Sequence, residues 1–418
     1  MAEHFDIAIV GGGIIGASLA NHLVTVNAGR LRIALIESRA TETAMSSFAS
    51  GKAKSPKDFN SRVVALSAAS QAQLQALEVW QEISPHACPY REMEVWDEEG
   101  TGSIHFDCAD IHEPALGYIV ENHVVVQALF QRLKGFANVH VLDATVTGFT
   151  SPENADTAEE GAEAPAVLNR LTLDNNHSIS ADLVVAADGA RSQLRQWMAF
   201  DTREWDYDHT AIVTTVTTSQ PHRHTAWQCF SVDGPVAFLP LHDEFHCSIV
   251  WSLKTSVAEQ KLLLDDEAFC RSLTQALQAR LGPVVATNTR MSFPLRQRHS
   301  KRYVKDGLVL LGDAAHTVHP LAGQGANLGL YDVDALAKEI ARACSRQLAV
   351  NDASVLHRFE RQRMPHNLMA MATLEGFKQL FGTDNLALRW MRNTGMSFLN
   401  RQPLIKNQLA KIASGKFI

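Results

Sequence analysis

The sequence has few of the features that mark secreted, membrane-spanning or nucleic-acid-binding proteins. Its six cysteines are scattered without a CxxC pair, which is typical of reduced thiols and not of a disulfide framework or a metal site. No uncharged apolar run reaches the roughly 18 residues that a membrane span needs. Met1 to Asp6 contain neither a basic nor an apolar segment, so we expect no secretory signal. A formal net charge of -7 argues against nucleic acid as the main partner.

What remains is an ordinary globular composition. The chain has 418 residues, of which 46% are hydrophobic and 20% are charged. This is enough apolar material for a sizeable core, and the length favours two domains.

The first motif is a glycine loop, Gly11 to Gly16, which reads GGGIIG. It lies between a predicted buried strand, Asp6 to Val10, and a predicted helix, Ile14 to Val26. The three glycines of a GxGxxG loop permit the tight turn, the approach of the backbone to a pyrophosphate and the close packing of helix on strand. Glu37 ends the next predicted strand, Leu31 to Ile36, where a carboxylate can accept hydrogen bonds from ribose hydroxyls. The pattern predicts dinucleotide binding over a plain glycine turn, but it does not separate NAD from FAD.

Two later segments favour FAD. Asp188 and Gly189 close a predicted apolar strand that ends at Ala187, and Gly312 and Asp313 close another that begins at Gly307. Asp313 is placed to hydrogen-bond a ribityl or ribose hydroxyl. The glycine-rich run after it opens a helix, and a helix N-terminus aimed at the pyrimidine edge of a flavin would stabilise the negative charge of its reduced form. Each segment alone fits a plain βα turn, whereas the three in this order indicate a flavoprotein.

The three segments resemble a known family. GGGIIG, AADGARSQLR and GDAAHTVHPLAGQGANLGL are similar to the fingerprints of single-component flavin aromatic hydroxylases, the p-hydroxybenzoate hydroxylase fold. HPLAGQGANLGLYDVDAL, RVVALS, MEVWD and GYIVEN resemble the ubiquinone-biosynthesis hydroxylases within it. WDY at Trp205 to Tyr207, AFLPL and CSIVWSL look closest to the 2-polyprenylphenol C5 hydroxylase branch, although the demethoxyquinol branch shares much of this pattern.

The resemblance covers nearly the whole chain and implies an α/β fold. It predicts a discontinuous Rossmann-like FAD-binding domain at residues 1–76, 107–196 and 298–345. A mixed β-sheet substrate domain at 77–106 and 197–297 is inserted into it, and residues 346–418 form a helical C-terminal region.

The resemblance also implies the chemistry. NAD(P)H would reduce FAD transiently, O2 would be captured as a flavin C4a-hydroperoxide, and the distal oxygen would pass to a polyprenylated phenol in ubiquinone biosynthesis, at C5. Hydroxylation of demethoxyubiquinol (2-polyprenyl-3-methyl-6-methoxy-benzoquinol) and another flavin reaction, such as prenyl reduction, stay open as alternatives. No metal is implied.

The resemblance assigns residues to two roles. As catalytic residues it implies Arg62 at the flavin, and His319 and Pro320 beside the ring. His316 and His319 can equally be histidines that neighbours satisfy or that merely line a pocket, and no general base can be identified. The residues implied to bind FAD are Gly11, Gly13, Ile14, Ile15, Gly16, Glu37, Arg62, Asn122, Asp188, Gly189, Gly312, Asp313, Pro320, Gly323, Gly325, Ala326, Asn327 and Leu328.

Asn122 departs from the pattern of many relatives, which carry an arginine that reaches the FAD pyrophosphate at this place. The amide can donate a hydrogen bond but brings no charge, so weaker FAD binding is expected.

The segment Gly376 to Ile418 has seven basic residues against Asp384 alone, with apolar residues between them. Such a surface can dock on an anionic membrane, or the helices can pack on the body with a solvated basic face. We expect a cytoplasmic enzyme with peripheral contact to the inner membrane, where its polyprenylphenol substrate resides, and a ubiquinone-biosynthesis complex as a further partner.

Three other classes of protein compete with a flavin hydroxylase. An NAD-dependent dehydrogenase would use only the first motif and would be colourless. A flavin halogenase would carry a WxWxIP segment, which does not occur here. A non-enzymatic assembly subunit would bind FAD without consuming NAD(P)H.

Overall fold

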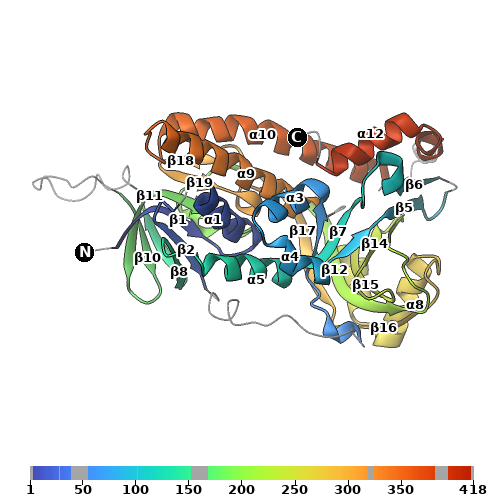
Figure 1. Cartoon of the computed structure of the whole chain (residues 1–418). Coiled ribbons are helices and arrows are strands. Elements are labelled where there is room, and N and C mark those ends of the chain that lie inside the picture. Colours follow the sequence, from blue (N-terminus) through green and yellow to red (C-terminus); the bar gives the residue numbers. More distant parts are fainter. Residues whose placement is uncertain are drawn as a thin grey trace, which may run out of the picture.

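The computed structural model describes residues 3–27, 29–38, 55–100, 102–151, 168–318, 323–381 and 394–415. Within these ranges the chain forms an eight-stranded sheet, a nine-stranded sheet and a small three-stranded sheet. The two large sheets lie side by side, and the C-terminal helices extend along both of them (Figure 1).

The eight-stranded sheet carries the first motif. Its main path has the order β18-β19-β11-β1-β2-β8, and all neighbours from β19 to β8 are parallel. The strands on this path are β18 (Val304–Lys305), β19 (Leu308–Leu310), β11 (Ser178–Ala186), β1 (Glu3–Val10), β2 (Ile33–Glu37) and β8 (Val139–Asp143). β10 (Asn169–Leu173) pairs with β11, and β9 (Val146–Thr150) pairs with β10. Segments about three hundred residues apart in sequence therefore lie two strands apart in this sheet.

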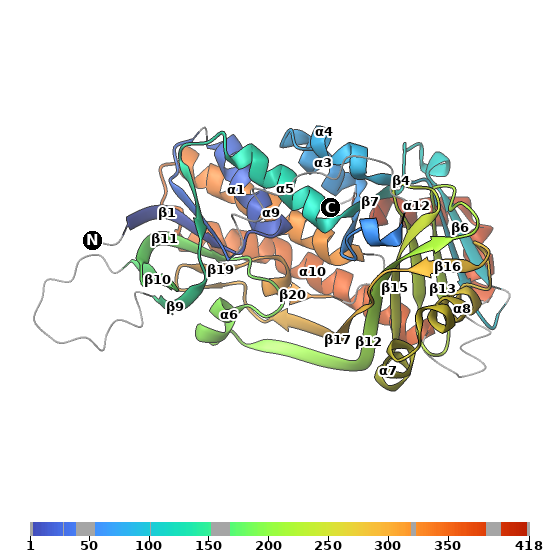
Figure 2. The ribbon, with the colours of Figure 1, turned by 90° about the horizontal axis from the view of Figure 1, so that it is seen from below.

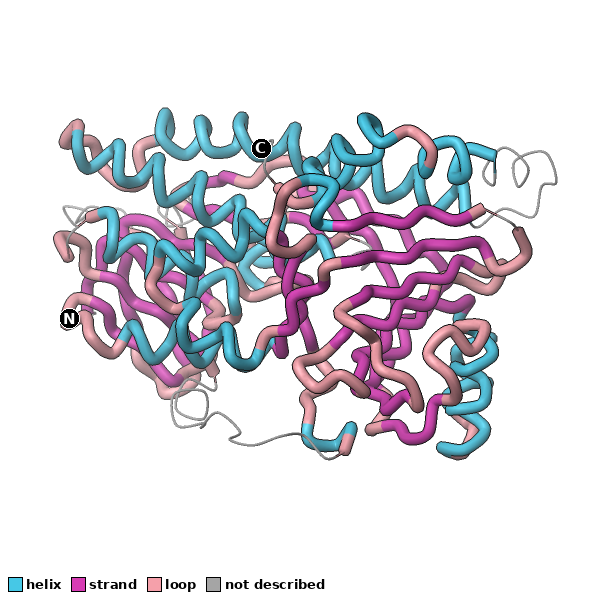
Figure 3. The backbone as a smooth tube through the Cα atoms, turned by 45° about the vertical axis from the view of Figure 1, so that its right-hand side comes forward, coloured by secondary structure: helices cyan, strands magenta, loops and turns pink. Residues whose placement is uncertain are grey.

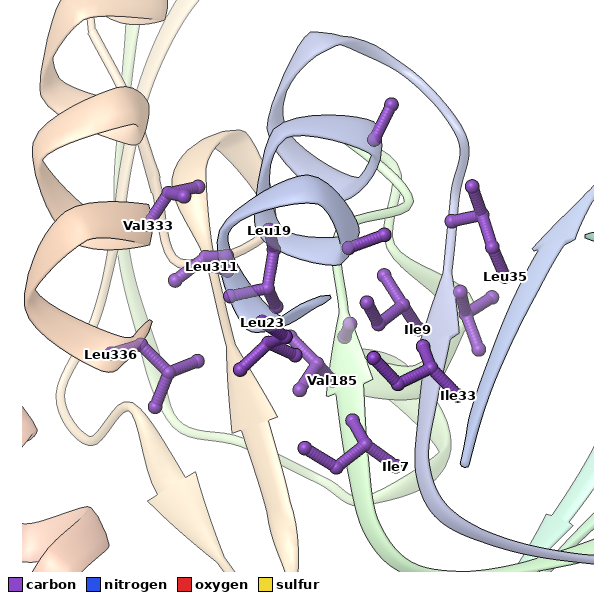
Figure 4. Close-up of a cluster of buried hydrophobic side chains, with 14 of the residues drawn as sticks. Ile7, Ile9, Leu19, Leu23, Ile33, Leu35, Val185, Leu311, Val333 and Leu336 are labelled. Atoms are coloured by element: carbon purple, nitrogen blue, oxygen red, sulfur yellow. The ribbon is translucent and has the colours of Figure 1, made fainter. Parts of the chain in front are cut away.

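Helices cover this sheet because its strands are apolar on both faces, as parallel strands usually are. α1 (Ile14–Val26) packs between α5 (Asn122–Leu133) and α9 (Gln324–Ser345). The core between them contains Ile7, Ile9, Leu19, Leu23 and Leu336, all fully buried (Figure 4).

The three-stranded sheet corrects one prediction. β3 (Val63–Ser67), β7 (Gly117–Glu121) and β4 (Cys88–Tyr90) pair in the order β3-β7-β4. The sequence alone predicts a helix over Ala65 to Leu77, but the chain stays extended to Ser67 because β3 pairs with β7. α3 (Ala68–Ala76) starts only where the Ser67 hydroxyl accepts the N–H of Ser70.

Residues 77–106 were predicted to join the substrate domain, but the start of this segment packs with the eight-stranded sheet. Leu77, Trp80 and Ile83 are buried in the core of the eight-stranded sheet, the last two in α4 (Trp80–Ile83). The chain enters the nine-stranded sheet only at β5 (Glu92–Asp97).

The nine-stranded sheet has the order β20-β17-β12-β15-β14-β13-β5-β6, with β16 (Val284–Thr287) beside β12. Its other strands are β20 (His316–Thr317), β17 (Met291–Ser300), β12 (Thr202–Thr218), β15 (His246–Lys254), β14 (Val236–Pro240), β13 (Thr225–Phe230) and β6 (Ser103–Asp107). α7 (Thr255–Leu262) and α8 (Asp266–Ala276) adjoin this sheet. β12 is the long strand that reaches from the side of α6 (Gln193–Trp197) to β15 (Figure 2).

The C-terminal region is helical, as predicted, within the described residues. α10 (Ala353–Phe381), a helical segment at 394–400 and α12 (Pro403–Ala413) lie along one side of the molecule (Figure 3). The end of the chain is anchored, because the Ala69 N–H donates to the Ser414 carbonyl over 3.1 Å. None of the described helices combines the length and the apolar character needed to span a bilayer.

Candidate active site

Four predicted segments meet at one edge of the eight-stranded sheet. Neighbouring strands end together, since the Ala187 N–H donates to the Val10 carbonyl at 2.8 Å and the Leu311 N–H to the Ala186 carbonyl at 3.0 Å. The glycine loop, Glu37, Asp188 and Gly312 follow or end these strands. The carboxyl ends of parallel strands are where open α/β sheets bind their ligands.

The glycine loop has the geometry of a phosphate cradle. Gly11 has φ +103°, and a Cβ there would lie 2.4 Å from the Ala187 carbonyl oxygen. A Cβ on Gly13 would instead meet no other atom within 4 Å. Gly13 is the N-cap of α1 and supplies no side-chain cap, so the first N–H groups of the helix face an open space that suits a pyrophosphate.

Glu37 closes the other side of this loop. Its Oε2 accepts the Gly12 N–H at 2.8 Å, which holds the carboxylate at the end of β2 beside the loop. A Cβ on Gly16 would lie 1.9 Å from the Gly11 carbonyl oxygen, so only glycine allows α1 to approach so closely.

Ile15 joins the two distant motifs. Its side chain packs against Gly312, where a Cβ would lie 3.1 Å from Ile15 Cγ1. It also packs against Gly329 on α9, where a Cβ would lie 2.6 Å from Ile15 Cδ1. Glycine at both positions lets α1, α9 and the Gly-Asp segment come together.

Two carboxylates face this region. The side chain of Asp313, in η5 (Gly312–Ala314), reaches solvent, although protein atoms surround most of its carboxyl group. The surrounding protein raises the pKa of its carboxyl group, and the charges of His316 and Arg62 oppose this effect. Burial also raises the pKa of Asp188, whose Oδ2 accepts the Gln193 N–H at 2.9 Å and whose Oδ1 has no partner among the described residues. Carboxylates with spare acceptor capacity fit the ribose and ribityl hydroxyls of FAD.

Asn327 fastens the start of α9 to β3. Its Nδ2 donates to the Ala65 carbonyl at 2.9 Å, and its Oδ1 accepts the Ser67 N–H at 2.9 Å and the Ser70 hydroxyl at 2.7 Å. The side chain predicted to contact FAD is thus occupied within the protein. Gly323, at φ 63°, is the N-cap of α9 and provides no side-chain cap for the first N–H groups of the helix.

The other predicted residues surround this site or lie outside the described ranges. The Asn122 N–H donates to the Arg62 carbonyl at 2.9 Å, so these two residues meet where β3 and β7 adjoin α5. Gly189 has φ 80° and follows Asp188. Gly325, Ala326 and Leu328 are in the first turns of α9, while His319 and Pro320 lie outside the described residues.

His316 is part of a buried ionic network that sequence reasoning did not find. Its Nε2 and the Asp332 Oδ2 are 2.5 Å apart, and both side chains are fully buried. Arg363 on α10 donates from Nε to the Asp332 Oδ1 at 2.7 Å, and Asn367 donates to the same oxygen at 3.0 Å. Burial acts to raise the pKa of Asp332, but His316 and Arg363 together hold it below its usual value. Nε2 of His316 is thus paired, whereas its buried Nδ1 has no hydrogen-bond partner among the described residues. The network joins β20 to α9 and α10.

A cleft lies between this site and the nine-stranded sheet. Its cavity volume is about 50 Å³, and the empty space around it amounts to about 550 Å³ when open solvent at the mouth is included. Ala65, Ile119 and Gly323 form one wall. The other wall is one face of the nine-stranded sheet, with the apolar residues Met93, Ala226, Pro235, Ala237, Leu239 and Val250. Tyr90, Gln228 and Ser252 are its polar residues. An apolar cleft with a few polar groups suits an aromatic ring with one or two oxygens.

Comparison with known proteins shows the family of this chain. The family model described as FAD binding domain matches residues 4–373. The 3-demethoxyubiquinol 3-hydroxylase of Escherichia coli (strain K12) is 36% identical over 98% of this chain and 98% of its own length. The mitochondrial ubiquinone biosynthesis monooxygenase COQ6 of Danio rerio is 32% identical over 99% of this chain and 90% of its own.

Solved structures confirm the predicted fold class. PqsL of Pseudomonas aeruginosa, in complex with 2-aminobenzoylacetate, has a TM-score of 0.73 at 21% identity, covering 94% of this chain and 99% of its own. The p-nitrophenol 4-monooxygenase PnpA of Pseudomonas putida DLL-E4 has a TM-score of 0.73 at 18% identity, covering 98% of this chain and 97% of its own. At these identities the likeness concerns the fold alone.

Proposed function

We propose that this chain hydroxylates the ring of a polyprenylated phenol. The premise is that the chain belongs to the FAD binding domain family and, within it, to the ubiquinone-biosynthesis hydroxylases. The chain is an FAD-dependent monooxygenase. The observation that carries the proposal for the substrate is the apolar cleft that opens beside Ala65 and Gly323.

The residues of the chain have three tasks in this reaction. FAD, when bound, supplies the redox chemistry with NAD(P)H and O2. The N-terminus of α1 and Glu37 would hold the adenosine diphosphate end, and Asp313 with the start of α9 would hold the flavin end. The apolar walls of the cleft exclude water, and Tyr90, Gln228 and Ser252 would orient the oxygens of the ring.

The ring position has two candidates. We propose C5 of the polyprenylphenol, on the resemblance of the segments around Tyr207, Ala237 and Cys247. Hydroxylation of demethoxyubiquinol is the second candidate, and the 36% identity to the Escherichia coli enzyme of that name favours it.

The test uses the purified holoenzyme with NAD(P)H and O2. It is offered a 2-polyprenylphenol and a demethoxyubiquinol, and the products are identified by mass spectrometry. A hydroxylated polyprenylphenol supports the first candidate, and a hydroxylated demethoxyquinol supports the second. If neither substrate gains oxygen, and deletion of the gene leaves quinone levels unchanged, the proposed function is wrong.

We further propose that the C-terminal helices dock on an anionic membrane at its cytoplasmic side, beside the other enzymes of the pathway. Leu404 is 88% exposed, and Phe398 and Ile412 are half-exposed or more. Arg401 is exposed between them, whereas Lys406 is occupied by the Asp110 carboxylate at 2.9 Å. Exposed apolar side chains with cations beside them are typical of interfacial helices.

Flotation with liposomes tests the membrane proposal. Leu404→Glu is expected to reduce co-flotation with phosphatidylglycerol vesicles, and added salt is expected to weaken it further. Leu263→Glu is the matched control, because Leu263 is 87% exposed beyond the end of α7, away from these helices. Equal flotation of Leu404→Glu and the wild type would contradict the proposal.

A further inference from the structure

The segment proposed to hold the flavin end of FAD runs from η5 through β20 to the start of α9. A Cβ on Gly325, in the first turn of α9, would lie 3.6 Å from Val318 Cγ2 and 3.7 Å from Asp313 Oδ1. The first turn of α9 therefore lies directly against η5 and against the residue that follows β20.

A buried carboxylate joins the two sides of this segment. Asp332 lies on α9, eight residues after Gln324, and its Oδ2 is 2.5 Å from Nε2 of His316 on β20. Both side chains are fully buried. His316 is three residues after Asp313, so the pair fastens the strand that follows Asp313 to the body of α9.

The second oxygen of Asp332 is held from α10. Arg363 Nε donates to Oδ1 at 2.7 Å, and Asn367 Nδ2 donates to the same atom at 3.0 Å. Arg363 Nη2 in turn donates to Asn367 Oδ1 at 2.9 Å, so these three side chains form a closed ring of hydrogen bonds. Both oxygens of the carboxylate thus have partners, and its position is fixed by β20, α9 and α10 together.

The backbone of β20 does not provide this link. β20 pairs with β17 at the edge of the nine-stranded sheet, where His316 is opposite His299. This pairing fixes β20 to the sheet that lines the cleft, but not to α9. The imidazole of His299 is turned to the Tyr303 hydroxyl, 3.1 Å from Nε2, so Asp332 is left to His316 and to α10.

The stability of the fold alone does not explain the network. Leu330, Val333, Leu336 and Phe359, on the same two helices, are buried in an apolar core. Apolar side chains of similar volume are often as stabilising as a buried ion pair, or more so, because buried charges lose their hydration. In addition, the buried Nδ1 of His316 has no hydrogen-bond partner among the described residues, which costs free energy. A network of this kind fixes one arrangement of the elements that it joins.

We propose that Asp332 and Arg363 are positioning residues for the flavin end of FAD. They keep β20 on α9, and so they set how Asp313 is placed relative to the start of the helix. Neither side chain touches the ligand, because protein encloses both of them. α10, a helix of the C-terminal region, is thereby part of the support of the cofactor site. This inference rests on the proposed function, in which Asp313 and the start of α9 hold the flavin end.

The test compares the binding of FAD and of ADP to the full-length chain after FAD has been removed, by titration calorimetry. ADP would occupy only the adenosine end of the site, at the N-terminus of α1 and Glu37. We expect Asp332→Asn and Arg363→Met to weaken FAD binding on the order of tenfold, which corresponds to one hydrogen bond to a charged group. The Kd of ADP is expected to stay unchanged, whereas a domain that had lost its structure would lose both ligands.

Arg358→Met is the matched control. Arg358 Nε lies 3.3 Å from Glu339 Oε2, so this ion pair also joins α9 to α10. Glu339, however, is about 22 Å along α9 from the start of the helix, whereas Asp332 is about 12 Å from it. Arg358→Met is expected to bind both FAD and ADP as the wild type does.

A further variant keeps the test valid if the single substitutions prevent folding. His316→Leu, Asp332→Leu and Arg363→Met, combined in one chain, replace the ionic network by apolar side chains, and this triple variant is expected to fold. Its FAD binding is expected to be weakened on the order of tenfold, as in the single variants. At saturating FAD, time-resolved fluorescence anisotropy should show faster motion of the flavin ring in the triple variant than in the wild type and in Arg358→Met.

The possible outcomes separate the two proposals. If the wild type binds FAD no more tightly than ADP, the chain has no site for the flavin end and the proposed function fails. If the wild type prefers FAD, but Asp332→Asn and the triple variant bind it equally well, the positioning role is wrong and the proposed function stands. If ADP binding falls as much as FAD binding, or if Arg358→Met behaves as Asp332→Asn does, the network acts through general packing and the positioning role is likewise wrong.

Discussion

The two faces of β15 are both buried, but one carries apolar side chains and the other carries mostly polar ones. On the outer face, Cys247, Ile249 and Trp251 pack with Phe269 of α8 in an apolar cluster. On the inner face, His246, Ser248 and Ser252 lie toward the cleft. The outer face is explained by packing alone. The inner face contains buried polar atoms without a hydrogen-bond partner among the described residues, where apolar residues of similar size would cost less, so packing alone does not explain its composition.

The largest effect on the free energy of unfolding is expected from a substitution on the outer face. Trp251 is almost fully buried against Phe269, with 6.1 Å between ring centres, and Lys261 Nζ lies 5.5 Å from its ring. Trp251→Ala is expected to lower the free energy of unfolding by about 3–5 kcal/mol, measured by thermal and denaturant unfolding. Val285→Ala is the control, because Val285 is 60% exposed, and it should change stability by less than about 0.5 kcal/mol. A small effect of Trp251→Ala would mean that the outer face does not carry the stability.

The next effect belongs to the inner face and concerns activity. Ala237 lines the cleft on β14, and a phenyl ring there would occupy space that the substrate needs. Ala237→Phe is expected to lower kcat/KM for a polyprenylphenol by roughly 10–200-fold while FAD stays bound. Ala286→Phe, on β16 outside the cleft, is the comparison variant. Unchanged kinetics of Ala237→Phe would show that the ring binds elsewhere.

Neighbouring residues give the sharpest contrast between the faces. Ile249→Val removes one buried methyl group from the outer face and is expected to cost about 0.5–1.5 kcal/mol. Ser248→Ala removes a hydroxyl without a protein partner and should leave the free energy of unfolding unchanged or slightly higher. The pair is compared in one denaturant series. A loss of stability in Ser248→Ala equal to that in Ile249→Val would erase the distinction between the two faces.

The smallest effect is a pH dependence at Asp243. The folded-state pKa of Asp243 is lowered, so its contribution to stability is present above the unfolded-state pKa, and it is lost as the pH falls through the folded-state value. The group is partly exposed, so solvent screening limits the contribution to about 0.5 kcal/mol at pH 7. Asp243→Asn should be less stable than the wild type at pH 7; the difference should begin to shrink near a pH of about 4 and vanish only below the folded-state pKa, as followed by thermal unfolding. A difference that grows toward low pH would have the wrong sign.

The FAD-binding part of the molecule could be predicted from the sequence better than the part that contains the cleft. The glycine loop, Glu37 and the Gly-Asp segment are contiguous motifs whose residues act through backbone geometry, and the structure aligns them at one edge of the sheet. The last residues of β3, from Ala65 to Ser67, were predicted as helix because a local pattern does not show the pairing with β7, about fifty residues away. Leu77, Trp80 and Ile83 were grouped with the wrong sheet for the same reason.

The cleft and the ionic network of His316, which the sequence motifs do not contain, could not be predicted from the sequence. The walls of the cleft come from seven strands, β3, β4, β5, β7, β13, β14 and β15, and from the residue that caps α9. Alternation gives the two faces of each strand but not which face meets the cleft. The ionic network of His316 depends on Asp332 and Arg363, which two different helices supply.

The sequence by itself determined that this chain binds a dinucleotide, that the dinucleotide is a flavin, and which family it resembles. These conclusions rest on glycines and carboxylates at fixed short spacings, where local backbone geometry sets the chemistry. Only the tertiary structure decided which side chains share the cleft, that His316 is paired with an aspartate to which an arginine also donates, and that His246 is on the same face of β15 as the residues that line the cleft. Those relations join residues that are distant in the chain, and they follow from strand register and packing, which no local pattern contains.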